Sequence, residues 1–292
     1  MARLSHTIEY VGALAGTKLA NLLSARAADR FGAALGSLAY RLWVSRRRVA
    51  RDNLKQAFGA SLTDEQISAI SRNVFKNAGR TVVEFARFQR IGREGAKRII
   101  VSDCLDLLQR IHSEGKGAVM LTAHFGNWEL LGSWLAAMGF PVDFLVGEQH
   151  NKLVDDLLNG FRREMGVGII PLRTSIRGIF KSLKANRFTG VVADQHAPSG
   201  YVVVEFFGRP AAAPKGPAAF AVKAGSPLVP FLMRRERYDR HVVMPGEPIY
   251  PPNSGNEDED IEVMTKAYTE FFEDGIRQYP DQWLWTHRRW KL

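Results

Sequence analysis

The chain has 292 residues, of which 46% are hydrophobic and 24% are charged. This composition is typical of a protein with a substantial core, and it excludes a disordered or low-complexity chain. The single cysteine, Cys104, excludes an intramolecular disulfide and a zinc site built from thiolates, and it fits a reducing compartment. The chain has 40 basic and 30 acidic residues, so its net charge is +10. We therefore expect an anionic partner: nucleic acid, an anionic membrane surface or a phosphorylated substrate.

The amino-terminal segment is apolar but does not resemble a spanning helix. A membrane span needs about 18 uninterrupted apolar residues. Residues 8–23 come nearest, and Glu9, Lys18 and Asn21 interrupt them. We therefore predict a helix that lies in the headgroup region of an anionic leaflet.

Two further segments have an interfacial composition. Arg46, Arg47 and Arg48 follow Trp43, and residues 283–292 (WLWTHRRWKL) contain three of the six tryptophans beside two arginines and a lysine. Tryptophans and basic residues together are typical of the membrane–water interface, although the arginines alone also fit a solvated face of a core helix. We predict peripheral membrane attachment through residues 8–23, the arginines and this tail.

Residues 1–90 are predicted to be helical, with Thr63 as an N-cap before Asp64, Glu65 and Gln66. From about residue 100, buried-strand patterns alternate with helical ones. This alternation predicts an α/β fold with a mixed, largely parallel central sheet flanked by helices, behind a helical N-terminal cap. No linker separates two cores, so we expect a single domain over residues 1–292, with the cap at 1–90 and the α/β core at 100–292. The expected strands are 117–123, 142–146, 169–170, 189–193 and 228–233; the expected helices are 128–138, 152–165, 176–184, 218–224 and one opened by the acidic run 257–262.

Polar residues follow the expected strand 117–123 in the sequence AHFGNWE. His124 comes directly after the strand, where ligands collect in open α/β sheets, and histidine is easily poised as a base near neutral pH. Glu129 can share a pocket with His124 if a tight turn at Gly126 reverses the chain before the helix. The alternative is a structural or helix-capping histidine.

A second expected strand, 189–193, ends in Asp194 and Gln195. Asp194 can accept the second ring N–H of His124 and fix its tautomer, or it can cap the next segment. On the helix between these strands, Arg162 or Arg163 can bind a phosphate or stabilise an oxyanion, unless both are surface residues.

These residues lie in segments that resemble the bacterial lipid A biosynthesis acyltransferases, a family related to phosphatidylinositol-mannoside acyltransferase. The likeness covers nearly the whole chain. It includes AVMLTAHFGNWELLG, NKLVDDLLNGFRREMG, the DQ segment with its Phe-Phe-Gly hairpin, and the closing IRQYPDQWLWTHRRWK. Many members have a clearer N-terminal membrane helix, and the family often has an acidic residue where His196 stands, so His196 is given no role.

The resemblance implies roles for seven residues. His124 is expected to act as general base, with Glu129 as the acidic member of the His-x4-acid motif, and Asp194 as the partner of the histidine. Arg162 matches the functional arginine of the family, expected here to stabilise an oxyanion together with backbone donors near Gly126. Gly126, Asn127 and Gln195 are expected to help bind the acyl donor or a phosphate.

The expected reaction moves a fatty acyl chain from an acyl thioester to a hydroxyl of a membrane lipid, most simply a lipid A precursor. The co-substrate is acyl carrier protein or coenzyme A carrying the acyl chain, and no metal or other cofactor is expected. The expected location is the cytoplasmic face of the inner membrane, on an anionic surface. A lysophospholipid or glycolipid acceptor, a thioesterase or lipid hydrolase, and a non-enzymatic membrane-binding protein remain alternatives; nucleic acid is not expected, because no nucleic-acid-binding signature is present.

Overall fold

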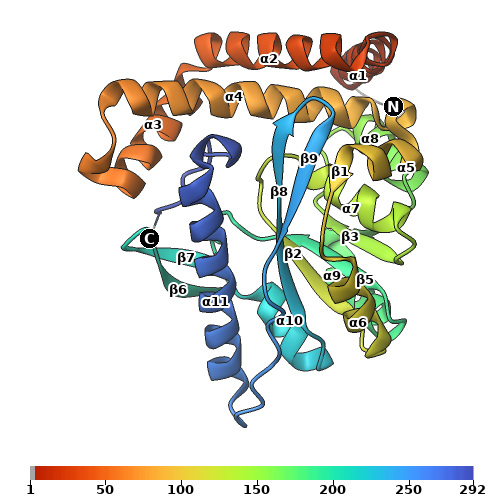
Figure 1. Cartoon of the computed structure of the whole chain (residues 1–292), viewed down its shortest axis with the longest axis vertical. Coiled ribbons are helices and arrows are strands. Elements are labelled where there is room, and N and C mark those ends of the chain that lie inside the picture. The colour runs from red at the N-terminus through yellow and green to blue at the C-terminus, as the bar shows by residue number, and fades with distance from the viewer. Residues whose placement is uncertain (1–3, 292) are drawn as a thin grey trace.

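The computed structural model describes residues 4–291. Its central sheet is formed by short runs of apolar residues, several of which are buried on both faces (Figure 1). The described residues form a seven-stranded sheet in the order β1-β9-β8-β2-β5-β3-β4. Neighbouring strands are parallel except β8 and β9, which pair as an antiparallel hairpin. The mixed, largely parallel sheet predicted from the sequence is therefore confirmed. The strands are β1 (Ile100–Val101), β2 (Ala118–Thr122), β3 (Val142–Val146), β4 (Val167–Pro171), β5 (Phe188–Val192), β8 (Leu228–Arg237) and β9 (Arg240–Pro245).

The expected strands are all present, but the sequence pattern missed β1 and β9. β1 has two residues, and β9, which lies between β1 and β8, includes exposed and half-buried residues, so neither has the continuous apolar run of a buried strand. The Phe-Phe-Gly segment forms the expected hairpin, β6 (Tyr201–Phe206) with β7 (Arg209–Pro214), which lies outside the main sheet.

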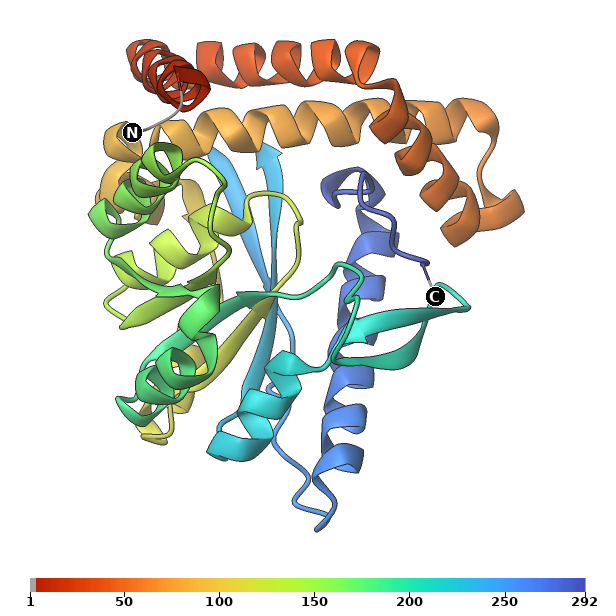
Figure 2. The ribbon, with the colours of Figure 1, turned by 180° about the vertical axis from the view of Figure 1, so that it is seen from behind.

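Helices cover both faces of the sheet, and each face has its own apolar core. One core joins the sheet to α5 (Phe88–Ile99), α6 (Leu105–Ser113), α7 (Trp128–Ala137) and α8 (Lys152–Glu164). The other joins it to α9 (Ser175–Lys184), α10 (Gly216–Ala224) and α11 (Glu257–Gln278), and it extends to the cap. Figure 2 shows the two layers from behind, with the sheet between them.

The N-terminal cap consists of α1 (Leu4–Leu22), α2 (Ala25–Leu42), α3 (Val44–Phe58) and α4 (Asp64–Ala86). Thr63 and Gln66 form a reciprocal capping box at the start of α4, which confirms the predicted N-cap. α4 lies between α2 and the sheet, across the end toward which β8 runs (Figure 1). The long helix α4 is therefore the cap helix that lies next to the ends of the strands.

α2 and α4 pack closely because small residues line their contact. A Cβ on Gly36 would lie 2.1 Å from the Phe75 carbonyl oxygen, and a Cβ on Gly79 would lie 2.3 Å from the Gly32 carbonyl oxygen. These contacts are between backbones, which no side-chain rotation can relieve.

The structure corrects the expectation that the tryptophan-rich tail is interfacial. Trp283 is 2% exposed and Trp285 is fully buried, and both belong to the apolar core. Arg289 is also buried, and its guanidinium donates to the Ala212 carbonyl oxygen at 2.8 Å. The tail is therefore a core element, in which aromatic residues that are typical of an interface pack against the hairpin β6–β7. Within residues 4–291, no helix has the length and apolar character needed to cross a membrane.

Gly36→Ala should lower the free energy of unfolding by about 1–3 kcal/mol, because the added methyl group forces α2 away from α4. Gly12→Ala on α1 is the matched control: nothing lies within 4 Å of the place that its Cβ would occupy, so the better helix propensity of alanine should stabilise by up to about 1 kcal/mol. Urea unfolding followed by circular dichroism measures both. Equal effects at the two positions would contradict the close α2–α4 contact.

Candidate active site

His124 and Asp194 meet because the strands that precede them are neighbours. β2 and β5 pair in parallel with Thr122 opposite Val192, so their carboxyl ends deliver both residues to the same edge of the sheet. His124 Nδ1 lies 2.7 Å from Asp194 Oδ1, and the His124 backbone N–H donates to Asp194 Oδ2 at 3.0 Å. A carboxylate only accepts, so Nδ1 carries the proton and the Nε2 lone pair remains available to accept another.

Charge and burial set the protonation of this pair. Burial alone would lower the pKa of His124, but the charge and hydrogen bond of Asp194, with a further contribution from Glu129, raise it above its usual value. Burial would likewise raise the pKa of Asp194, but His124 and the hydrogen bond from Trp283 hold it below its usual range. The carboxylate therefore stays ionised, and the His124 side chain, 25% exposed, remains accessible from solvent.

Glu129 lies in the first turn of α7, and it is paired with Arg162 of α8. Arg162 Nε donates to Glu129 Oε2 at 2.9 Å and Nη2 donates to Oε1 at 2.6 Å, while Nη1 donates to Asn159 Oδ1 at 2.7 Å. The guanidinium also lies 5.1 Å from the ring centre of Phe85. Both charged groups are largely buried, so this bidentate pair fixes the first turn of α7 beside His124.

The remaining predicted site residues lie near His124 but differ in their burial and hydrogen bonds. Gly126 adopts φ +54°, as the predicted tight turn requires, but its N–H already donates to the Gln282 carbonyl oxygen at 2.9 Å. Asn127 is fully buried and caps α7 by accepting from the Leu130 N–H. Gln195 Nε2 lies 3.4 Å from His124 Nδ1 and is partly exposed. Of these three residues, only Gln195 is partly exposed, since Gly126 and Asn127 are buried.

Two tryptophans, Trp283 and Trp128, also belong to the site, although no sequence motif assigned them to it. Trp283 Nε1 donates to Asp194 Oδ2 at 2.6 Å, and the Trp128 ring packs edge-on against His124 with centroids 4.9 Å apart. Trp283 lies in the closing segment IRQYPDQWLWTHRRWK, which carries part of the family resemblance but whose composition is typical of a membrane interface. A buried indole N–H needs an acceptor, and Asp194 provides it.

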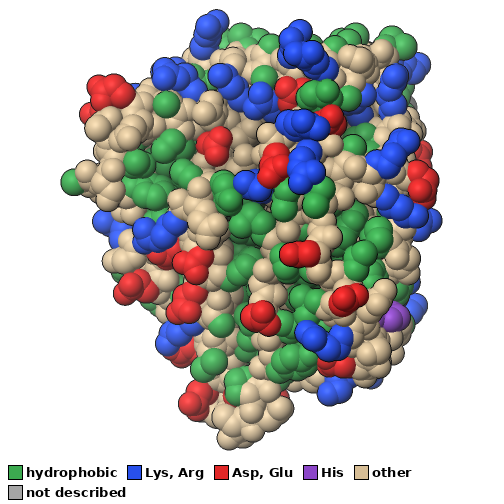
Figure 3. Space-filling view, viewed as in Figure 1, with side chains coloured by type: hydrophobic (Ala, Val, Ile, Leu, Met, Phe, Trp, Pro, Cys, Tyr) green, Lys and Arg blue, Asp and Glu red, His purple; other side chains and the backbone are tan. Residues whose placement is uncertain are grey.

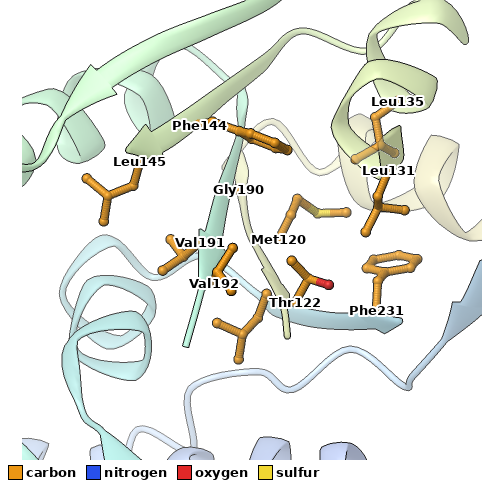
Figure 4. Close-up of a pocket in the computed structure, with 11 residues that line it drawn as sticks. Met120, Thr122, Leu131, Leu135, Phe144, Leu145, Gly190, Val191, Val192 and Phe231 are labelled. Carbon is orange, nitrogen blue, oxygen red and sulfur yellow. The ribbon is translucent and has the colours of Figure 1, made fainter. Parts of the chain in front are cut away.

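A narrow apolar space lies beneath the strand ends, between the sheet and α7 (Figure 4). Met120, Leu131 and Phe231 surround it, and Phe144 lies at the far end from Thr122. Its volume of about 20 Å³ holds little more than one water-sized sphere. The Thr122 hydroxyl, two residues before His124, has no hydrogen-bond partner among the described residues.

A larger cavity of about 490 Å³ is lined in part by Gln195, which lies beside His124. Its walls come from α2, α4 and the tail, with Gln195 connecting it to the His124–Asp194 pair. The lining is mainly apolar, with Phe75, Val82 and Leu284 among its members and Arg46 and His287 as polar groups. Cavities of this size and polarity are typical of sites for apolar ligands.

Thr122→Val should raise the free energy of unfolding by about 1 kcal/mol, because it replaces an unpartnered buried hydroxyl with a methyl group. Thr189→Val is the control in β5, since the Thr189 hydroxyl donates to Ser182 Oγ at 3.0 Å and its loss should destabilise. Denaturant unfolding measures both changes. Destabilisation by both substitutions would mean that the Thr122 hydroxyl is hydrogen-bonded in solution, for example to a buried water.

The chain is similar in sequence to known acyltransferases. Residues 2–292 match the model of the bacterial lipid A biosynthesis acyltransferases. Phosphatidylinositol mannoside acyltransferase of Mycobacterium tuberculosis (strain H37Rv) is 27% identical, over 64% of this chain and 58% of that protein. Lipid A biosynthesis lauroyltransferase of Escherichia coli K12 is 25% identical, over 90% of this chain and 84% of that protein. Because the family match extends over residues 2–292, the chain belongs to the bacterial lipid A biosynthesis acyltransferase family.

Proposed function

We propose that the protein transfers a fatty acyl chain from an acyl thioester to a hydroxyl group of a membrane lipid, with His124 as general base. The observation that supports this most directly is the contact of 2.7 Å between His124 and Asp194 at the edge of the sheet, beside an apolar cavity. A histidine whose second nitrogen is held by a buried carboxylate is suited to remove a proton from a hydroxyl group.

The proposed reaction is a direct transfer. The acceptor hydroxyl loses its proton to His124 Nε2 as its oxygen attacks the thioester carbonyl carbon. The tetrahedral intermediate then collapses, the C–S bond breaks, and the protonated His124 returns its proton to the leaving thiolate. Cys104 takes no part, because it is buried and burial raises the pKa of its thiol, which disfavours a nucleophilic thiolate.

Glu129 and Arg162 have a supporting role in this proposal. We expected Arg162 to bind the oxyanion, but each of its guanidinium nitrogens already donates to Glu129 or Asn159. We propose instead that Arg162 holds Glu129 in place, where the charge of Glu129 favours the imidazolium form of His124 during the reaction. The Gly126 N–H, which is bonded to Gln282, is likewise not proposed as an oxyanion donor.

The proposed acceptor is a lipid A precursor, and the proposed donor is acyl carrier protein or coenzyme A carrying the acyl chain. The relatives named above act on lipid A or on a phosphatidylinositol mannoside, so a glycolipid acceptor is the closest alternative. Phosphorylated acceptors and acidic donors both suit a chain with a net charge of +10. The 490 Å³ cavity beside Gln195 is proposed to hold an apolar chain of one substrate.

Asp194→Asn should lower kcat by about 100-fold or more, and it should shift the acid limb of the pH–activity profile. Since Asp194 raises the pKa of His124, removing its charge should lower that pKa. Because His124 acts as a base only when it is neutral, the acid limb of the profile should move to lower pH, and the maximal rate on the plateau should fall. Initial rates between about pH 5 and pH 9, with radiolabelled acyl thioester and lipid acceptor, measure both effects.

His124→Ala should lose turnover, whereas His112→Gln should not, because His112 lies near the amino ends of β2 and β5. Thin-layer chromatography of the products separates acylated lipid from free fatty acid. Release of free fatty acid without acylated lipid would identify a thioesterase instead. Unchanged turnover in His124→Ala would contradict the proposed general base.

The protein is proposed to attach peripherally to the cytoplasmic face of the inner membrane through α1 and the cap. Exposed apolar residues recur along one side of α1 at helical spacing, and further exposed apolar side chains lie on α2, at the start of α3 and on α4. Figure 3 shows basic side chains gathered around the end of the molecule formed by the cap. Each such residue near an anionic surface contributes about 1 kcal/mol. The α1 residues are Leu4, Ile8, Val11, Leu19 and Leu22.

The double substitution of Ile8→Glu with Val11→Glu should reduce sedimentation with anionic vesicles, because both side chains are exposed and the change opposes insertion. Val263→Glu on α11 is the control, since Val263 is similarly exposed but far from the cap in sequence. Activity on detergent-dispersed acceptor should remain. Equal sedimentation of all three proteins would contradict attachment through α1, and resistance of the native protein to alkaline carbonate extraction would contradict peripheral attachment.

A further inference from the structure

A network of buried polar side chains holds the loop that carries His124, and the proposed reaction uses none of them directly. Two of these residues, Thr81 and Glu84, come from α4, and a third, Arg235, comes from β8. Glu84 Oε2 accepts from Asn127 Nδ2 at 2.7 Å, and the Glu84 carboxylate accepts from Arg235 Nε at 3.1 Å and Nη2 at 2.5 Å. Thr81 Oγ1 donates to the Gly126 carbonyl oxygen at 2.7 Å and accepts from Arg235 Nη2 at 2.8 Å.

The charges in this network are almost removed from solvent. The Glu84 side chain is 13% exposed and the Arg235 side chain is 4% exposed. His241 is fully buried 3.7 Å from Glu84, but burial lowers its pKa, so Arg235 supplies the positive charge. Burying an ion pair costs desolvation energy that often cancels its attraction, so apolar residues of similar size would stabilise the fold equally well. Stability alone therefore does not account for the pair.

The bonds converge on Gly126 and Asn127, two and three residues after His124. Around these residues the loop has little freedom, because a Cβ on Gly126 would lie 1.8 Å from the Met233 carbonyl oxygen. The opposite side of the loop is bonded to the tail, where the Leu284 N–H donates to the His124 carbonyl oxygen at 3.0 Å. The Glu84–Arg235 pair thus completes a set of bonds around the turn that aims His124 at Asp194.

We propose that Glu84 is a positioning residue for His124, acting through Asn127 directly and through Arg235 and Thr81 on Gly126. The effect on turnover rests on the acyl transfer proposed above. A displacement of about 1 Å in a catalytic group lowers turnover by about 100-fold, so the loss of this support has a large effect on kcat without a change in the substrate contacts. The pair also connects α4, a helix of the cap, with the catalytic loop.

The test compares Glu84→Ala with Glu84→Gln. Glu84→Ala removes the hydrogen bonds that the Glu84 carboxylate accepts from Asn127 and Arg235, and we expect kcat to fall by about 100-fold with KM unchanged. Glu84→Gln removes the charge but keeps an acceptor oxygen for Asn127, and we expect most of kcat to return. If Glu84→Ala does not fold, Thr81→Val tests the part of the network that acts on Gly126, because it removes the hydroxyl that donates to the Gly126 carbonyl oxygen, and we expect kcat and the His124 pKa to fall in this variant as well.

Asp143→Ala is the matched control for the loss of an arginine pair. Asp143 binds Arg187 Nε at 2.6 Å and Nη2 at 2.8 Å near the amino end of β3, away from the loop. We expect this variant to lose stability but to keep the kcat of the folded protein.

NMR titration of the His124 imidazole provides a readout that does not need acyl transfer. Asp194 and Glu129 are the acidic groups that act on His124, and His287 is a neighbouring basic group; all remain in every variant. A displaced loop weakens the contact with Asp194, so we expect the pKa of His124 to fall in Glu84→Ala and to stay unchanged in Glu84→Gln and Asp143→Ala.

Three results would overturn the positioning role. The first is an unchanged kcat and an unchanged His124 pKa in Glu84→Ala. The second is an equal loss of kcat in Glu84→Gln and Glu84→Ala, which would indicate an effect of charge. The third is a loss of kcat in Asp143→Ala as large as that in Glu84→Ala. If the native protein transfers no acyl group, the proposed function fails, while the NMR titration still decides whether Glu84 positions His124.

Discussion

The contact between His124 and Asp194 depends on the parallel pairing of β2 with β5. The register sets Thr122 opposite Val192, so the next residues of both strands emerge together at one edge of the sheet. A shift by one residue would turn the side chains of a strand to the opposite face and separate the two groups. The apolar cores on both faces of the sheet maintain this register, because the strand residues are buried between helices.

Hydrogen bonds and ion pairs from several other segments hold this pair and the residues next to it in place. The first turn of α7 is fixed by the Glu129–Arg162 pair, Asp194 is held by Trp283, and the turn at Gly126 is bonded to α4 and to the tail. These partners come from segments that are distant in sequence. Buried hydrogen-bonded charges of this kind define one arrangement of the side chains, which the general base proposed for His124 would require.

The helical cap connects the site with the proposed membrane surface. Its inner helix, α4, contacts the loop that carries His124 through Thr81 and Glu84, and together with α2 and the tail it lines the cavity beside Gln195. Its outer helices carry exposed apolar residues. The close α2–α4 contact holds two walls of that cavity together.

The sequence by itself determined the alternation of strands and helices, the positions of His124 and Asp194 at strand ends, and the turn at Gly126, because each depends on local patterns of burial or backbone conformation. Only the tertiary structure decided which groups meet. Trp283 and Trp285 have the composition of an interface yet lie in the core, and Arg162, expected at an oxyanion, is paired with Glu129. Glu84 and Arg235 are 151 residues apart, and nothing in either local sequence indicates their contact. The Glu84–Arg235 pair follows from the packing of α4 across the end of β8, which brings together side chains that no sequence spacing relates.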